Sequence, residues 1–146
     1  MSMSDYLEEE LLNYLLRTQA TFLGGSKPAT IGIALCTAAP SDSDDGSSIT
    51  EVANSFSYAR QTLNPADANW TDPSAGTQGE SDNASTVTFG PASGGNWGTI
   101  THVAILDSST HGAGNMLFYG SLSTSKTIND GDTFLFNIGD LNIQMN

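Results

Sequence analysis

The first part of the chain carries apolar residues at helical spacing. Ser4 or Asp5 can cap the start of a helix here, and Gly24-Gly25 can end it. The sequence therefore predicts an amphipathic α-helix over residues 4–23. Seven large apolar side chains share one side of this helix: Leu7, Leu11, Leu12, Leu15, Leu16, Phe22 and Leu23.

A helix face this rich in leucine must be buried against something. It can fold back on the sheet of its own domain, or it can dock on a neighbouring subunit. Both arrangements are compatible with the pattern. For the second arrangement, the expected protein-contact residues of the helix are Leu7, Leu11, Leu15 and Phe22.

After Pro28 the periodicity changes from helical to alternating, which is typical of β-strands. Turn residues separate the alternating segments at short intervals, as in antiparallel all-β folds. We expect a mainly β fold, an antiparallel, jelly-roll-like β-sandwich over residues 29–146. The predicted strands are 30–37, 57–63, 84–90, 99–107, 115–122, 132–137 and 140–145.

The strand predicted over 99–107 has no fully polar face. Alternation places one set of side chains on one face, namely Ile100, His102, Ala104 and Leu106. The other face would carry Thr99, Thr101, Val103, Ile105 and Asp107. A strand with apolar residues on both faces is typically central in its sheet and covered on both sides.

Two long loops interrupt the strands, at residues 38–56 and 64–83. The first contains an acidic, serine-rich stretch around Asp44, for which we expect a solvated tip. The second contains Trp70, and an indole ring normally packs or marks a contact. Trp70 is therefore a candidate protein-contact residue.

The composition fits a small acidic protein. A chain of 146 residues is expected to form one domain. Sixteen acidic residues against four lysines and arginines give a net charge of −12. This charge disfavours direct binding to nucleic acid or to anionic membranes.

Cys36 is the single cysteine, and its place in an alternating apolar segment favours a buried small side chain over a reactive thiol. The first ten residues carry four acids and no base, which does not fit a secretory signal peptide. No apolar run approaches the length of a membrane span. We therefore expect synthesis in a cytoplasm and a soluble product.

The candidate chemistry is sparse. Asp42 begins an acidic stretch, but an EF-hand loop starting there would need Gly and Glu where the chain has Ser47 and Ala53. His102 alternates with apolar residues, which favours a half-buried, hydrogen-bonded side chain. His111 lies beside Ser108 and Ser109 in a predicted turn, an arrangement that does not make a catalytic triad. We predict no enzymatic activity, no cofactor and no metal site.

Several sequence blocks, taken in order, resemble a family of small virion structural proteins of tailed bacteriophages, of the minor structural, tail-fibre or head-decoration type. The resemblance covers most of the chain outside the two long loops. The blocks are Ser4–Glu8, Ile31–Leu35, Thr37–Pro40, Tyr58–Gln61, Trp97–Asp107, Leu117–Leu122, Lys126, Gly131–Phe134 and Gly139–Leu141. The resemblance implies a component of the virus particle.

Two virion roles follow from the resemblance, and the sequence leaves both open. The first is a capsid decoration or cement protein, bound at high copy to the outside of the head. The alternative is a tail-fibre-associated or baseplate component, with host surface glycans as a further contact; Trp70 and Tyr119 are the aromatic candidates for stacking on a sugar. We give third place to a cell-wall hydrolase carried in the particle, since no carboxylate pair can be nominated for it.

The expected partners are other virion proteins, either the major capsid protein or tail proteins, and further copies of the same chain. Arg60 is one of the few basic residues and is the remaining candidate contact residue. In an acidic chain it can form a bidentate pair with a carboxylate.

Overall fold

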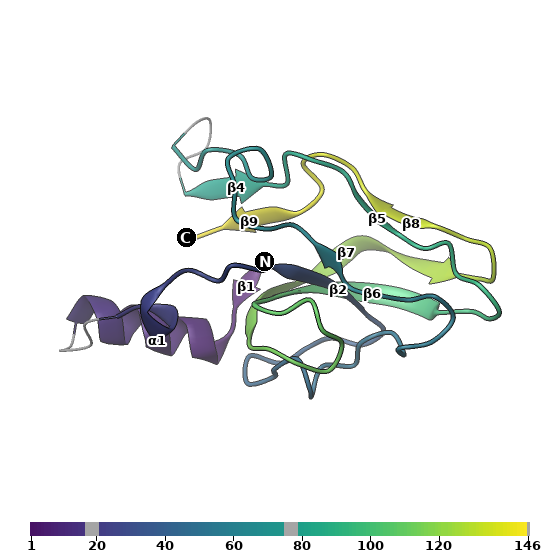
Figure 1. The fold of residues 1–146 in the computed structure, drawn as a ribbon, viewed down its shortest axis with the longest axis horizontal. Coiled ribbons are helices and arrows are strands. Elements are labelled where there is room, and N and C mark those ends of the chain that lie inside the picture. Colours follow the sequence, from purple (N-terminus) through teal and green to yellow (C-terminus); the bar gives the residue numbers. More distant parts are fainter. Residues whose placement is uncertain (17–20, 75–78, 146) are drawn as a thin grey trace.

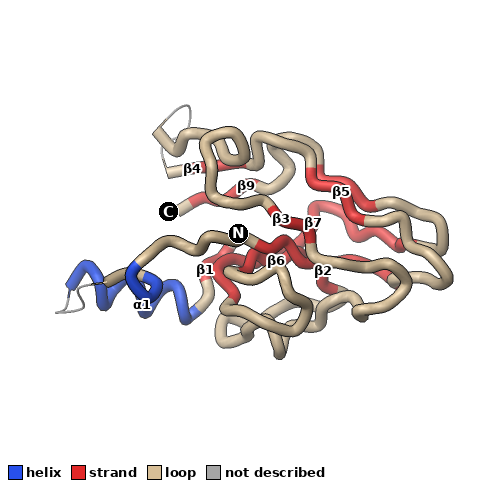
Figure 2. The backbone as a smooth tube through the Cα atoms, in the orientation of Figure 1, coloured by secondary structure: helices blue, strands red, loops and turns tan. Residues whose placement is uncertain are grey.

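The computed structural model describes residues 1–16, 21–74 and 79–145. Its largest element is a five-stranded antiparallel sheet (Figures 1 and 2). In spatial order the strands are β1 (Ser2–Met3), β7 (Met116–Ile128), β6 (Gly98–Leu106), β2 (Gly32–Cys36) and β3 (Gln61–Thr62). The strand β6 lies inside this sheet, as its two apolar faces predicted.

A second layer covers one face of the large sheet. It consists of two separate antiparallel ladders, each with two strands (Figure 1). One ladder pairs β5 (Val87–Phe89) with β8 (Phe134–Phe136), and the other pairs β4 (Glu80–Asp82) with β9 (Asn142–Gln144). The mainly β, antiparallel fold with an N-terminal helix is confirmed. The second layer is divided into two ladders and does not form one continuous sheet.

The main hydrophobic cluster fills the space between the two layers. Phe89 of β5 is fully buried and lies within 6.3 Å of three aromatic rings, those of Tyr58, Phe134 and Phe136, measured between centroids. From the large sheet, β2 contributes Ile33 and Leu35, while β6 contributes Ile100, Val103 and Ile105. Aromatic residues of the second layer therefore pack directly into this cluster.

A smaller cluster covers the opposite face of the large sheet. It contains Ala34, Cys36, Ile49, Ala104, Leu106 and Met116. Ile49 belongs to the predicted 38–56 loop, and that loop also sends Val52 into the main cluster. The loop is therefore more than the solvated tip that its acidic stretch indicated, because its second half covers a sheet face.

A change of register in β6 corrects the predicted face assignment. The pairing with β7 shifts between Ile100 and His102, so strict alternation fails at this point. As a result Ile100 lies in the main cluster with Val103 and Ile105, and not on the face of Ala104. Alternation predicted the faces correctly only after the shift.

Each predicted strand overlaps an observed strand, with different ends. The 57–63 segment is reduced to β3, and β7 continues to Ile128, six residues beyond its predicted end at Leu122. Two short strands were missed. These are β1 and β4, and β4 lies within the segment predicted as the 64–83 loop.

The N-terminal helix α1 spans Asp5–Leu16 (Figure 2). Ser4 caps it, because its hydroxyl oxygen accepts a hydrogen bond from the Leu7 amide at 3.4 Å. The predicted end at residue 23 was wrong: Phe22 is extended, and Leu23–Gly25 forms a short 3-10 turn. Residues 17–20 of the predicted helix lie outside the described residues. In the described ranges no helix is long and apolar enough to cross a membrane.

Cys36 is fully buried, as predicted. Burial raises the pKa of its thiol to about 12, with a further contribution from the charge of Glu51. We therefore expect the native protein to react with Ellman's reagent at pH 8 at least about a hundredfold more slowly than a free cysteine, because the thiolate is the reactive form. Thiol titration before and after unfolding in guanidinium chloride checks this, and rapid reaction of the native protein would contradict the burial.

Candidate interface

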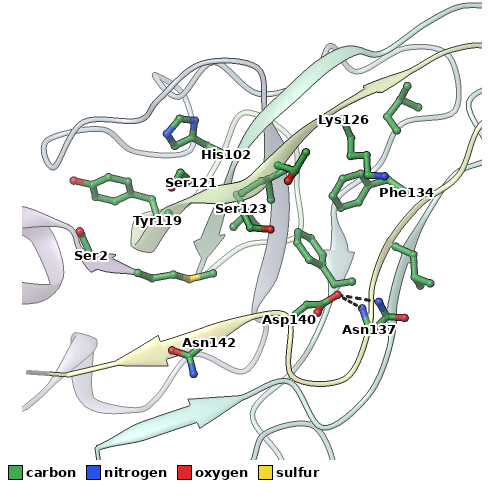
Figure 3. Close-up of a pocket in the computed structure, with 18 of the residues that line it drawn as sticks. Ser2, His102, Tyr119, Ser121, Ser123, Lys126, Phe134, Asn137, Asp140 and Asn142 are labelled. Atoms are coloured by element: carbon green, nitrogen blue, oxygen red, sulfur yellow. Dashed lines mark hydrogen bonds between the residues drawn. The ribbon is translucent and has the colours of Figure 1, made fainter.

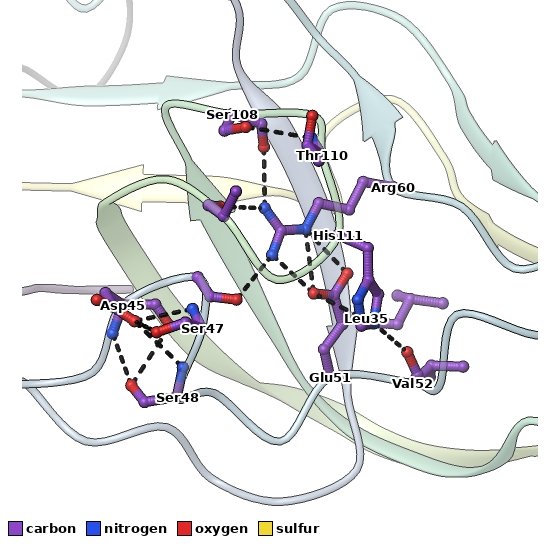
Figure 4. A network of polar contacts seen from close by, with 12 residues as sticks. Leu35, Asp45, Ser47, Ser48, Glu51, Val52, Arg60, Ser108, Thr110 and His111 are labelled. Atoms are coloured by element: carbon purple, nitrogen blue, oxygen red, sulfur yellow. Dashed lines mark hydrogen bonds and ion pairs between the residues drawn. The ribbon is translucent and has the colours of Figure 1, made fainter.

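Arg60 is the centre of a buried polar network (Figure 4). Its side chain is completely buried, and that of Glu51 is 3% exposed. The guanidinium forms a bidentate pair with this carboxylate, with N···O distances of 2.7 Å from one terminal nitrogen and 2.9 Å from Nε. The expected carboxylate partner is thus found, inside the molecule.

The remaining Arg60 N–H groups donate to backbone carbonyls of two loops. One terminal nitrogen donates to Ser108 O at 3.1 Å and to Ala113 O at 2.7 Å, and the other donates to Gly46 O at 3.2 Å. The arginine thereby ties the 38–56 segment to the turn between β6 and β7. Arg60 is an internal crosslink and does not present its charge to a partner.

Three further contacts complete this network. The Tyr58 hydroxyl donates to Glu51 at 2.9 Å and accepts from the Leu35 amide at 3.0 Å. Burial and the Glu51 charge raise the Tyr58 pKa well above its usual value. His111 Nε2 lies 2.9 Å from Val52 O, so this nitrogen carries the proton that is donated to the carbonyl. His111 therefore also connects the turn between β6 and β7 to the 38–56 loop.

The acidic stretch of the 38–56 loop forms its own hydrogen bonds. Asp44 accepts from the Ser41 amide at 2.7 Å, and Asp45 accepts from the amide and hydroxyl of Ser47. These bonds hold the pKa of both carboxyls below the usual range. Among the described residues, no cluster of three or more His, Cys, Asp or Glu side chains could hold a metal ion.

The candidate contact residues of α1 are not equivalent. Leu7 is buried in the main cluster, so it holds the helix to its own domain. Phe22 lies after the helix and packs partly against the same cluster. Leu11 is half-buried, and the side chain of Leu15 lies outside the described residues. The helix thus packs on its own sheet at its N-terminal end, as the first of the two arrangements predicted.

Further along, α1 extends beyond the sheets (Figure 1). Leu12 is 56% exposed and Leu16 is 77% exposed. These two residues were assigned to the apolar side without being chosen as contact candidates. In the described structure they are the exposed apolar residues of the helix.

Leu7→Ala is expected to lower the free energy of unfolding by about 2–3 kcal/mol, because it leaves a cavity where the helix meets the core. Leu12→Ala, the matched control on the same helix, is expected to change it by less than about 0.5 kcal/mol. Urea unfolding of both variants gives the comparison. Equal losses of stability in the two variants would contradict the buried position of Leu7 and the exposed position of Leu12.

Trp70 lies in a shallow hollow on the second layer. Its indole N–H donates to Leu63 O at 3.1 Å, and its ring is half-buried against the main cluster. The hollow measures about 600 Å³ and is bordered by Lys27, Asp67 and Asp72 in addition to Trp70. Tyr119 is far from this site in the fold: it lies on β7, and its hydroxyl donates to Asp42.

A second concavity is an open groove of about 1160 Å³ between β7 and the second layer (Figure 3). One wall consists of β7 residues from Tyr119 to Ile128, and the other consists of β8 with the segment to Asn142. His102 lines part of this groove. It is half-buried and hydrogen-bonded to Thr101 at 2.9 Å, as predicted, but it lies outside both apolar clusters and is not a core residue.

The sequence prediction missed the part of the β7 wall after Leu122, because residues 123–127 were not assigned to a strand. Serines and threonines in this stretch are compatible with β-structure, but no apolar residue alternates with them. The pattern therefore lacked the signal that identified the other strands.

Comparison with known protein families gives one match. The family model is described as Gp80, Podophage GP4 fiber I protein gp80, and it matches residues 2–144. A search among curated proteins found no match to the chain. The matched range contains every strand and helix described above.

Proposed function

Because this chain belongs to the family of podophage GP4 fiber I proteins, we propose that it is a structural subunit of the fibre apparatus of a tailed phage. Membership already makes it a small virion structural protein of a tailed phage. The observation that carries the finer proposal is that the match extends over residues 2–144, from β1 to β9.

The physical properties of the molecule support an architectural role. A buried ion pair with its full set of hydrogen bonds ties the 38–56 loop to the turn between β6 and β7. The exposed leucines at the end of α1 and the open groove offer surfaces for other subunits. We propose that the protein contacts other virion proteins and further copies of itself, since symmetric assemblies reuse the same interface many times.

The fibre role has more support than the capsid decoration role that the sequence placed first. The family description names a fibre protein, whereas small size, acidity and a β fold fit both roles equally well. Decoration of the head surface remains the alternative outcome of the test.

We also propose that the subunit has no catalytic activity. Of its two histidines, His111 is engaged with Val52 and His102 with Thr101. A lysis assay on peptidoglycan gels with the purified protein tests this proposal, and a cleared zone would overturn it.

The fibre proposal is tested by separating purified particles into heads and tails and counting copies of the protein in each fraction by mass spectrometry. We expect the protein in the fraction that carries the fibres, at a copy number set by the fibre symmetry. Hundreds of copies on isolated heads would instead identify a decoration protein.

A second candidate function is contact with host surface glycans, for which the hollow at Trp70 is the supporting observation. An aromatic ring beside carboxylates and a lysine can stack on a sugar ring and bind its hydroxyl groups. A glycan array with wild type, Trp70→Ala and the control Phe56→Ala tests this. Binding lost only in Trp70→Ala supports it, and no binding by any of the three removes it.

A further inference from the structure

One edge of β7 has no partner strand over most of its length. On one side β7 pairs with β6 from Met116 to Ser121 and from Lys126 to Ile128, and the register shifts across residues 122–125. On the other side β1 pairs only with Phe118 and Tyr119. Within the described ranges, no backbone hydrogen bond joins residues 121–127 to any segment other than β6. Residues 121–127 therefore have no partner strand on this edge, which the register shift interrupts.

This part of β7 is also exposed on its two faces. Every residue from Ser121 to Thr127 is exposed except Leu122, which is half-buried. Natural proteins usually shorten, cover or break such an edge, since it is a template for another strand. Lys126 is the single charged residue on it, and the stretch contains no proline.

The edge borders the open side of the two layers. On the opposite side, β3 of the large sheet contacts β5 of the second layer. Here β7 and β8 form the two walls of the groove of about 1160 Å³ (Figure 3). Among the residues that the structure describes, β8 pairs only with β5, so its other edge has no partner strand there. A groove between two free strand edges fits an extended backbone better than a compact ligand.

The charge of this surface differs from that of the rest of the molecule. The chain has a net charge of −12, yet no acidic residue occurs between Asp107 and Asp130. Lys126 and Asp140 are the charged side chains in the lining of the groove. An acidic strand that pairs with the β7 edge would therefore meet Lys126 and no carboxylate of β7.

We propose that the groove accepts an extended segment of another virion protein, which lies along the β7 edge and places an acidic side chain opposite Lys126. This inference rests on the proposed function, because the occupant is a component of the particle. A second copy of this chain fits less well: pairing two β7 edges would bring no carboxylate to either Lys126.

The first experiment places the photo-crosslinking amino acid p-benzoylphenylalanine at position Ser123, which lines the groove, in protein that is assembled into particles. The control position is Thr88, an exposed residue in the middle of β5. We expect the Ser123 position to crosslink to one segment of a different virion protein, and the Thr88 position not to crosslink to that segment.

Crosslinking of Ser123 to a second copy of the chain would overturn the proposed occupant. Absence of any crosslink in particles that contain the protein would overturn the inference while leaving the fibre proposal intact. Absence of the protein from particles would instead overturn the fibre proposal, and the inference with it.

The second experiment compares Lys126→Glu with Lys27→Glu. Both lysines are exposed, so the two variants have the same net charge and leave the core unchanged. We expect Lys126→Glu to reduce the copies per particle about fivefold relative to Lys27→Glu, since it replaces an attractive contact with a repulsive one. Equal incorporation of the two variants would contradict the proposed charge pairing.

Discussion

Arg60→Ala is expected to lower the free energy of unfolding by about 3–5 kcal/mol, which is a large share of the stability of a small domain. The substitution leaves Glu51 as a buried charge with its guanidinium partner gone. It also removes the donors to Ser108 O, Ala113 O and Gly46 O. Chemical denaturation monitored by tryptophan fluorescence measures the loss.

Two controls separate the ion pair from a general effect of removing a basic residue. Lys126→Ala removes an exposed charge, and we expect it to change stability by less than about 0.5 kcal/mol. Arg60→Met combined with Glu51→Met replaces both charges by apolar side chains, and we expect it to be less destabilising than Arg60→Ala. A loss below about 1 kcal/mol in Arg60→Ala would show that the network does not hold the loops.

Phe89→Ala is expected to have a comparable effect, about 3–5 kcal/mol, for a different reason. The ring is fully buried between the layers and packs against Tyr58, Phe134 and Phe136. Since β5 and β8 have only three residues each, side-chain packing has to hold this ladder on the large sheet. Removing the ring leaves a cavity at the centre of that contact.

The matched control for Phe89→Ala is Thr88→Ala. Thr88 is the neighbouring residue on the same short strand, and its side chain is exposed. We expect a change below about 0.5 kcal/mol for this variant, measured by urea unfolding. Similar losses in both variants would mean that the strand itself, and not the buried ring, determines the stability of the second layer.

Sequence pattern predicted the elements better than their contacts. Periodicity identified the helix and seven strands, because apolar side chains recur in these segments at the spacing of a helix or a strand. It placed Ile100 on the wrong face, since a register shift depends on the pairing with β7 and leaves no trace in local alternation. It also ended β7 too early, where hydroxyl side chains replace the apolar ones.

For the site residues, too, the sequence pattern predicted less about their contacts than about their types. The carboxylate pair predicted for Arg60 is confirmed, but it lies inside the molecule and not at a protein contact, and no local pattern selects Glu51 from sixteen acids. Burial of the pair depends on loops that meet only in the folded chain. For α1, helical spacing grouped Leu7 with Leu12 and Leu16, and only the tertiary arrangement separates the buried residue from the exposed ones.

The most direct test of the fibre role is the position of the protein on the intact particle. Gold-labelled antibody fragments against the purified protein, imaged on whole phage by electron microscopy, provide this measurement. We expect label on the fibres and none distributed over the head surface. Label spread evenly over the head, with unlabelled fibres, would contradict it.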